Sequence, residues 1–152
     1  MAKEGTGLTE KLNPEPPILG YTDKSMVKID FDDASFKLVK YWALGTVKWF
    51  KLRGSTILKS SENHYHVVFD RSVTWRKNTH IMAWACVESK NTGLKKLFLI
   101  QCLKESSTLR VSRKKEKASP RFVFRYGKQG HEIESYLAGR KHIKKIDKKV
   151  NS

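Results

Sequence analysis

Residues 26–32 read MVKIDFD, a stretch in which apolar and polar side chains alternate. The odd-numbered positions are apolar and fall on one side of an extended chain, whereas Asp30 and Asp32 fall on the other side. A period of two is typical of a half-buried strand. We therefore expect the first strand of the fold at residues 26–32, with two carboxylates on its polar face.

A helix is expected directly after this strand. Asp33 or Ser35 can accept hydrogen bonds from the first free amides of a helix. The pattern of apolar residues continues to Phe50, and the helix should end before Gly54. The apolar residues that recur at the three- and four-residue spacing of one helix face are Phe36, Val39, Ala43 and Val47.

A β-hairpin is expected next. Residues 55–59 and 64–69 are strand-like, and a polar break suited to a turn separates them. In the second strand Tyr65 points to one face, whereas His64 and His66 share the other face. The two imidazoles and the two carboxylates are therefore expected on the same face of the sheet.

The remaining pattern completes the predicted fold. We expect a helix over residues 79–89, strands over residues 97–103, 109–112 and 122–126, and a last helix over residues 131–146. The order of elements predicts an α+β fold. It suits an open, mostly antiparallel sheet of the RRM-like βαββαβ type, with helices on one face and the other face left for a ligand.

Length and composition indicate one domain without a membrane span. The 152 residues suit a single core at residues 23–146, between a flexible N-terminal segment at 1–22 and a basic tail at 147–152. No apolar run approaches the roughly 20 residues of a spanning helix, and the N-terminus resembles neither a signal peptide nor a membrane anchor. Cys86 and Cys102 lack metal-ligand spacing, which predicts buried free thiols and a cytoplasmic protein.

The chain carries a net charge of +16, and most of it lies in the C-terminal third. Residues 104–149 hold 15 Lys and Arg against 5 Asp and Glu, a net charge of +10. Such a field attracts phosphate, which predicts DNA or RNA as a partner and no membrane; the alternative is a solvated basic tail. The residues expected to contact nucleic acid are Arg113, Lys114, Lys115, Lys117, Arg140, Lys141, Lys144 and Lys145.

The carboxylates of the first strand suggest a metal site. Asp30 and Asp32 are two positions apart, so their Cα atoms should lie roughly 6 to 7 Å apart on one face. Carboxylates placed in this way can share Mg²⁺ or Mn²⁺, which bridge nucleotide phosphates in polymerases and nucleases. The alternative is that Asp32 and Asp33 begin the helix while Asp30 is solvated.

The two segments together resemble the archaeo-eukaryotic primase superfamily. The first motif of that family is a hydrophobic strand that ends in Asp-x-Asp, which residues 29–33 (IDFDD) match. The second motif is a Ser-to-His turn, which residues 59–69 (KSSENHYHVVF) match, and one helix separates the two motifs. The resemblance spans about residues 26–126.

This resemblance implies a primase-polymerase-like nucleotidyltransferase domain that acts on nucleic acid in replication, or an inactive derivative of one. It implies a nucleoside triphosphate as substrate, Mg²⁺ or Mn²⁺ as cofactor and replication proteins as partners. Asp30, Asp32 and His66 would form the catalytic site. The nucleotide-binding residues that the resemblance implies are Ser60, Ser61, His66, Arg110, Ser112 and Lys114.

The third motif of that family departs from the pattern here. The family has an acidic metal ligand shortly before an Arg-rich turn, and residues 108–114 (TLRVSRK) resemble the turn. No Asp precedes it, and Glu105 is the nearby carboxylate. Glu105 is therefore the expected third metal ligand beside Asp30 and Asp32, and catalytic activity depends on whether it reaches the cation.

A second hypothesis assigns the hairpin to another class of enzyme. The sequence His64-Tyr65-His66 is similar to the His-hydrophobic-His motif of rolling-circle (HUH) replication endonucleases, which bind a metal through both imidazoles and attack DNA with a helix tyrosine. Tyr136, with Lys141 beside it, would be that nucleophile. Tyr136 also fits an apolar helix stripe, in which case it packs in the core.

A third hypothesis is that the protein binds nucleic acid without catalysing a reaction. Residues 110–117 and 140–149 would bind phosphate, and exposed aromatic residues such as Tyr65 or Trp75 would stack on bases. The protein would then be a non-catalytic nucleic-acid-binding protein.

Overall fold

The computed structural model describes residues 17–114 and 117–150. Four strands form the main sheet in the order β2-β4-β3-β6, and every neighbouring pair is antiparallel. Two further strands, β1 and β5, pair with each other in a small antiparallel sheet. The strands are β1 (Gly20–Asp23), β2 (Met26–Phe31), β3 (Gly54–Ser61), β4 (His64–Ser72), β5 (Ser107–Arg110) and β6 (Arg121–Gly127).

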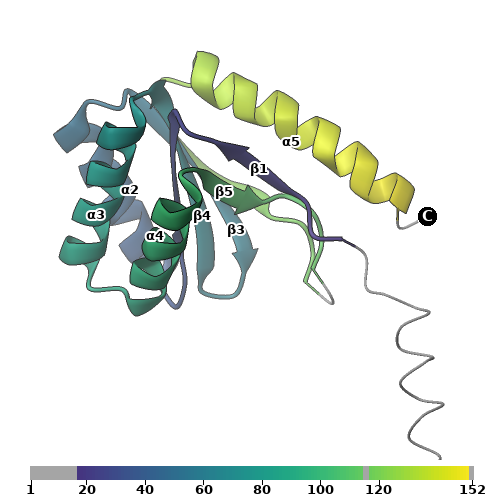
Figure 1. The fold of residues 1–152 in the computed structure, drawn as a ribbon, viewed down its shortest axis with the longest axis horizontal. Coiled ribbons are helices and arrows are strands. Elements are labelled where there is room, and N and C mark those ends of the chain that lie inside the picture. Colours follow the sequence, from purple (N-terminus) through teal and green to yellow (C-terminus); the bar gives the residue numbers. More distant parts are fainter. Residues whose placement is uncertain (1–16, 115–116, 151–152) are drawn as a thin grey trace, which may run out of the picture.

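Four helices are present in the described part of the chain, and they cover both faces of the main sheet. Figure 1 shows α2, α3 and α4 together on one face and α5 across the opposite face. The α+β class and the open antiparallel sheets are confirmed. Helices α2, α3 and α4 share one face as expected, but α5 covers part of the opposite face, which was expected to stay free for a ligand. The helices are α2 (Phe36–Phe50), α3 (Trp75–Ser89), α4 (Thr92–Lys104) and α5 (His131–Val150).

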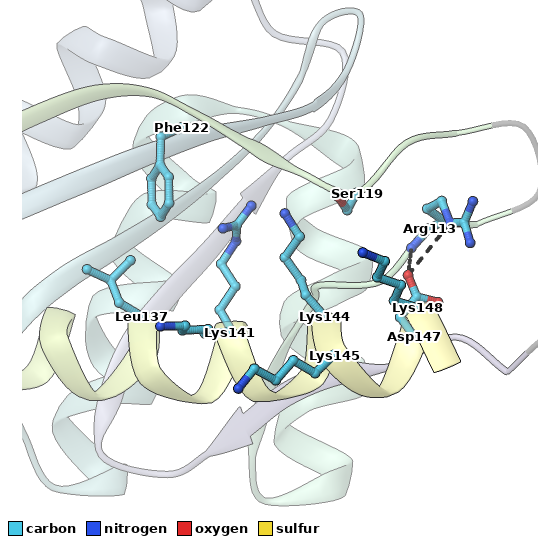
Figure 2. A pocket seen from close by; sticks show the side chains of 10 residues that line it. Arg113, Ser119, Phe122, Leu137, Lys141, Lys144, Lys145, Asp147 and Lys148 are labelled. Carbon is cyan, nitrogen blue, oxygen red and sulfur yellow. Dashed lines mark hydrogen bonds and ion pairs between the residues drawn. The ribbon is translucent and has the colours of Figure 1, made fainter. Parts of the chain in front are cut away.

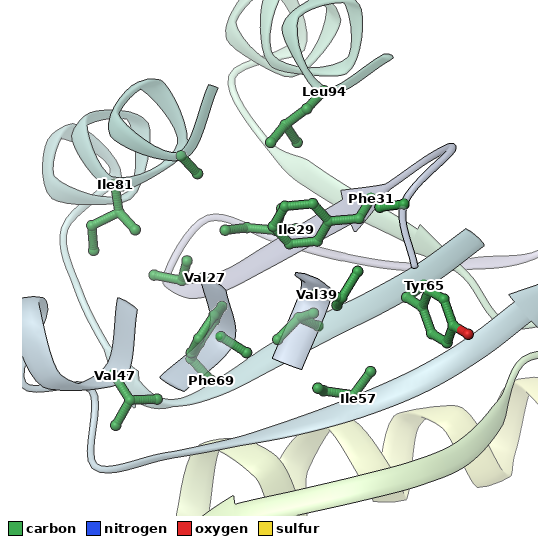
Figure 3. Close-up of a cluster of buried hydrophobic side chains, with 14 of the residues drawn as sticks. Val27, Ile29, Phe31, Val39, Val47, Ile57, Tyr65, Phe69, Ile81 and Leu94 are labelled. Atoms are coloured by element: carbon green, nitrogen blue, oxygen red, sulfur yellow. The ribbon is translucent and has the colours of Figure 1, made fainter. Parts of the chain in front are cut away.

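The larger hydrophobic core lies between the main sheet and helices α2, α3 and α4. The odd-numbered side chains of β2 and β4 enter it, as Figure 3 shows for Ile29 and Tyr65. Val39 and Val47 of α2 meet them from the helix side, which is the periodicity of three and four read from the sequence. Since the odd-numbered side chains of β2 and β4 pack in this core, their even-numbered side chains lie on the other face of the sheet.

The predicted strand at residues 97–103 is wrong, because these residues lie in α4. Asn91 caps this helix by accepting a hydrogen bond from the Leu94 amide at 2.9 Å. Leu94 and Gln101, seven positions apart, are buried, whereas Leu103 is exposed. A short apolar run does not separate a strand from a buried helix by periodicity alone, and here the cap and the burial pattern favour the helix.

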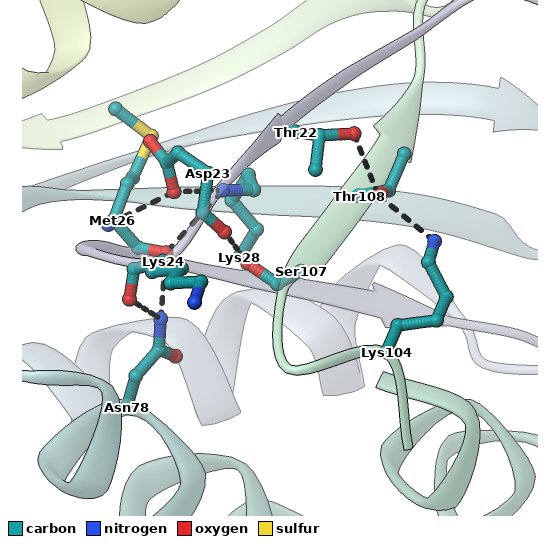
Figure 4. Close-up of polar contacts among 9 residues, drawn as sticks. All are labelled: Thr22, Asp23, Lys24, Met26, Lys28, Asn78, Lys104, Ser107 and Thr108. Atoms are coloured by element: carbon teal, nitrogen blue, oxygen red, sulfur yellow. Dashed lines mark hydrogen bonds and ion pairs between the residues drawn. The ribbon is translucent and has the colours of Figure 1, made fainter. Parts of the chain in front are cut away.

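The predicted flexible segment at residues 1–22 extends too far, because residues 20–22 belong to β1. Polar contacts tie the β1 and β5 sheet to the rest of the fold (Figure 4). Thr22 and Thr108 join β1 to β5 through their hydroxyl oxygens at 2.7 Å. The buried ammonium of Lys28 on β2 donates to Asp23 at 2.5 Å, so burial of this charge is compensated by its partner.

The C-terminal helix α5 packs on a second, smaller core. Tyr136 is fully buried there against Leu58 and Val68 of the sheet. The helix continues to Val150, so residues 147–150 of the predicted tail are helical, and Asp147 is buried. No helix in the described ranges is long and apolar enough to cross a membrane. Cys86 and Cys102 are both free thiols, as predicted, but only Cys86 is buried, whereas Cys102 is partly exposed.

Candidate functional site

The strand register brings the two sequence motifs together. Asp30 of β2 lies directly opposite His66 of β4, and the distance from Asp30 Oδ1 to His66 Nε2 is 3.6 Å. Next to this pair, Asp32 Oδ1 lies 2.7 Å from Nδ1 of His64. These four side chains, which we call the carboxylate–imidazole cluster, occupy the sheet face opposite the larger core.

Asp30 is placed where ionisation is unfavourable. Its side chain is 26% exposed, and its Oδ1 atom is buried without a hydrogen-bond partner. Burial raises the pKa of Asp30 to about 7, and the neighbouring Asp32 carboxylate adds to the increase. The charges of His64 and Arg110 oppose this shift. Two adjacent carboxylates with one orphaned oxygen form a negative site that a cation would stabilise.

His66 is neutral at physiological pH. Burial and, to a lesser degree, the nearby guanidinium of Arg110 lower the pKa of His66 to about 4, although Asp32 opposes the change. Its Nδ1 atom is buried and has no hydrogen-bond partner. A neutral imidazole with an unpartnered nitrogen can donate or accept one hydrogen bond, depending on its tautomer.

His64 is held by acidic residues on both sides of its ring. Its Nδ1 atom contacts Asp32, and its Nε2 atom lies 3.9 Å from Asp33 Oδ1. The hairpin turn positions it, because Ser60 Oγ donates to the carbonyl oxygen of His64 at 3.2 Å. Ser61 pairs with His64 across the turn. The Ser-to-His segment therefore folds as one tight hairpin end beside the carboxylates.

The end of β5 contributes Arg110 to the cluster. Its guanidinium influences the pKa values of both Asp30 and His66. The same guanidinium donates to the carbonyl oxygens of Ser112 and Ala118. Arg110 therefore connects the carboxylate–imidazole cluster to the loop that follows β5.

Two other residues predicted to bind nucleotide have different surroundings. Ser112 is fully buried, and its hydroxyl accepts from the Leu19 amide at 2.8 Å and donates to the Arg113 carbonyl oxygen. These contacts are structural. Lys114 is exposed and pairs through its backbone with Lys117.

Glu105 is not brought to the carboxylates. It is exposed at the C-cap of α4, where it adopts a left-handed conformation with φ of 55°. The charges that shift the pKa of Asp30 are those of Asp32, His64 and Arg110, and Glu105 is not among them. Over residues 17–114 and 117–150, no group of three or more His, Cys, Asp or Glu side chains is arranged to hold a metal ion.

Tyr136 and Tyr65 both lie in the interior. The Tyr136 ring packs edge-on against Tyr21 with 5.2 Å between centroids, and its hydroxyl is buried without a hydrogen-bond partner. This placement is that of a packing residue and gives the endonuclease hypothesis no accessible nucleophile. Tyr65 is 5% exposed in the larger core, so it is wrong as a base-stacking residue.

A basic groove lies between α5 on one side and Arg113, Ser119 and Phe122 on the other, with a volume of about 720 Å³ (Figure 2). It gathers five of the eight residues predicted to contact nucleic acid. Lys114 and Lys117 lie in the adjoining turn, and Lys115 falls outside the described residues. The basic side chains that line the groove are Arg113, Arg140, Lys141, Lys144, Lys145 and Lys148.

Sequence reasoning missed two features of this groove. Lys148 was included in the phosphate-binding range 140–149 but was not named among the contact residues, although it follows Lys141 and Lys144 at helical spacing. Phe122 was predicted only as a strand residue, and nothing local indicates that it faces the groove. Comparisons of the chain with protein-family models, curated proteins and solved structures find no match.

Proposed function

We propose that the protein is a metal-dependent nucleotidyltransferase of the primase-polymerase type that acts on DNA or RNA in the cytoplasm. The observation that carries this proposal is the meeting of Asp30 and Asp32 with His64 and His66 on one sheet face. The two motifs come from different strands and share no local reason to converge. The free thiols of Cys86 and Cys102 are consistent with a reducing compartment.

The donor set fits the metal that the resemblance implies. Asp30 and Asp32 offer hard carboxylate oxygens, which Mg²⁺ and Mn²⁺ prefer, and Asp30 Oδ1 has no hydrogen-bond partner, with His66 Nε2 3.6 Å away. A cation held by these two residues would bind nucleotide phosphates and offset their charge during phosphoryl transfer.

The remaining side chains have roles toward the nucleotide. His66, being neutral and buried beside Asp30, would support that carboxylate without adding charge, and a direct contact with a phosphate would require the site to open. Arg110 supplies a positive charge near Asp30. The end of the hairpin, at Ser60 and Ser61, lies next to His64. The basic groove, joined to the cluster through the contacts of Arg110, would hold the template strand.

The test is primer extension and primer-free synthesis with Mn²⁺ and nucleoside triphosphates. Asp30→Asn and Asp32→Asn should each abolish synthesis, because they remove the charge without changing side-chain size. The matched control is Asp33→Asn, since Asp33 is 93% exposed and asparagine tolerates its positive φ of 51°. Synthesis that survives Asp32→Asn, or is lost equally in Asp33→Asn, contradicts the proposed site.

A non-catalytic nucleic-acid-binding protein is the second candidate, favoured by one observation. Arg110, not a third carboxylate, is the charged residue of β5 that acts on Asp30. Under this hypothesis the wild type makes no product with any nucleotide or metal, and Asp30→Asn binds nucleic acid as tightly as the wild type does.

A further inference from the structure

The basic groove is not uniformly polar. Between its cationic side chains it is lined by Phe122 of β6 and Leu137 of α5. Figure 2 shows these two apolar side chains at one end of the groove, with the lysines of α5 following along the helix. A ligand that fills the groove must therefore combine a chain of negative charges with an apolar group.

The walls of the groove are fixed by contacts to α5. The buried carboxylate of Asp147 accepts from the Arg113 amide at 3.2 Å and lies 3.8 Å from the Arg113 guanidinium. At the other end, Arg140 donates to the carbonyl oxygen of Pro120. Because both ends of the loop are attached to the helix, the groove is present before any ligand binds.

Phe122 faces the groove because β6 contains an irregularity. Ile57 pairs with Phe124, but the next residue, Leu58, pairs with Phe122, so Val123 is an extra residue in β6. A β-bulge of this kind changes which side chains share a face. Phe124 packs in the larger core, whereas Phe122 packs with Leu58 on the α5 side. Without the bulge, Phe122 and Phe124 would share one face.

The aromatic ring is also surrounded by phosphate-binding groups. The guanidinium of Arg140 lies 4.6 Å from the Phe122 ring centroid, and that of Arg125 lies 4.8 Å from it. A base that stacks on the ring would have to displace one of these guanidiniums, which could then bind the adjacent phosphate. The Phe122 ring and these two cations lie close enough together to contact the base and the phosphate of a single nucleotide.

We propose that the basic groove binds single-stranded nucleic acid, with an unpaired base on Phe122 and Leu137 and the phosphates along Lys141, Lys144 and Lys148. Duplex nucleic acid presents phosphates but hides its base faces, and an acidic peptide without aromatic residues lacks the flat ring. Base–aromatic stacking is tolerant of sequence, so the groove should bind strands of any sequence. This inference rests on the nucleic-acid binding in the proposed function and is independent of the carboxylates.

The experiment measures affinity by fluorescence anisotropy for nucleic-acid probes that carry the same number of phosphates. The probes are an oligothymidine strand, an abasic strand and a duplex, together with an acidic peptide of the same charge. We expect the oligothymidine strand to bind about tenfold more tightly than the abasic strand. Equal affinity for these two strands, or tighter binding of the duplex or the peptide, overturns the inference.

Three variants separate the base contact from the phosphate contacts. Phe122→Leu should weaken binding of the oligothymidine strand about tenfold and leave the abasic strand unchanged. Phe124→Leu, the same change on the opposite face, should weaken neither strand. Lys144→Gln should weaken both strands and reduce the dependence of affinity on salt. An equal loss for both strands in Phe122→Leu would show that Phe122 is only structural.

The outcomes also distinguish this inference from the proposed function. If the wild type binds no nucleic acid even at low salt, the proposed function itself is contradicted. If it binds all strands equally and still extends primers, only the base contact is wrong. If base-dependent binding is observed without synthesis, the inference stands and the second candidate function is favoured.

Discussion

The carboxyl group of Asp30 and the imidazole of His66 lie 3.6 Å apart, and the usual order of their pKa values is inverted. Burial raises the pKa of Asp30 to about 7 and lowers that of His66 to about 4. In the absence of metal, the fold therefore favours the uncharged form of both groups. This relationship makes the pH dependence of stability informative.

The two shifts act in opposite directions. The pKa of Asp30 is raised, so its contribution to stability is present below pH 3.8 and is lost as the pH rises through about 7. The pKa of His66 is lowered, so its contribution is present above pH 6.5 and is lost as the pH falls through about 4. Between pH 4 and 6.5, a rise in pH therefore reduces the stability contributed by Asp30 and increases that contributed by His66.

Asp30→Asn should expose the contribution of His66. With the carboxyl group removed, the free energy of unfolding should fall more steeply from pH 7 to pH 4 than in the wild type. At pH 7 the variant should be at least as stable as the wild type, because no charge is buried at residue 30. Urea unfolding in the presence of EDTA at several pH values measures both effects. Parallel pH profiles would show that the two groups are not coupled to folding in this way.

Tyr136→Phe should leave stability unchanged or increase it by about 1 kcal/mol, because it removes a buried hydroxyl without a partner. Tyr136→Ala should cost about 3 to 5 kcal/mol, since the ring fills the smaller core. Thermal and urea unfolding measure both. If Tyr136 were the nucleophile of an endonuclease, Tyr136→Phe would lose DNA cleavage completely. Two results therefore argue against that hypothesis: cleavage that is retained in Tyr136→Phe, or no cleavage by either the wild type or the variant.

Glu105→Gly should stabilise the protein by about 1 kcal/mol, because glycine adopts the left-handed conformation at the C-cap of α4 without a Cβ clash. Synthesis with Mn²⁺ should be unchanged, since Glu105 lies outside the carboxylate–imidazole cluster. Glu105→Ala is the comparison, because it removes the carboxylate without the conformational gain. A loss of synthesis in both variants would restore Glu105 as the third metal ligand.

The parts of the fold and site that sequence predicted are those with local periodicity. The alternation in β2 and β4 places Asp30 and His66 on one face, and only the register between the strands had to be supplied by the structure. The apolar run at residues 97–103 has no clear period, and α4 was missed for that reason. β1 was missed because the strand with which it pairs is β5, far along the chain.

The features that sequence could not predict depend on distant contacts. Arg110 reaches Asp30 because of how β5 lies beside β2, whereas sequence proximity to the basic turn favoured Glu105. Phe122 enters the groove because of one extra residue in β6, and a strict alternation would have placed it on the wrong face.

The last prediction concerns Asp147, which lies in the basic groove yet is acidic. Asp147→Asn and Asp147→Ala both remove its charge, but asparagine keeps an oxygen that can accept the hydrogen bond from the Arg113 amide. If the residue acted only through its charge, both variants should bind a polyanion more tightly than the wild type. If it holds the loop against α5, the two variants should differ.

We expect them to differ. Asp147→Asn should bind both the oligothymidine and the abasic strand slightly more tightly, because the field of the groove becomes more positive. Asp147→Ala should lose about 1 to 3 kcal/mol of stability, because the buried Arg113 contact is gone, and its preference for the oligothymidine strand should fall as the groove wall loosens. Urea unfolding and the ratio of the two affinities measure these effects. Identical behaviour of the two variants would show that the hydrogen bond to Arg113 does not shape the groove.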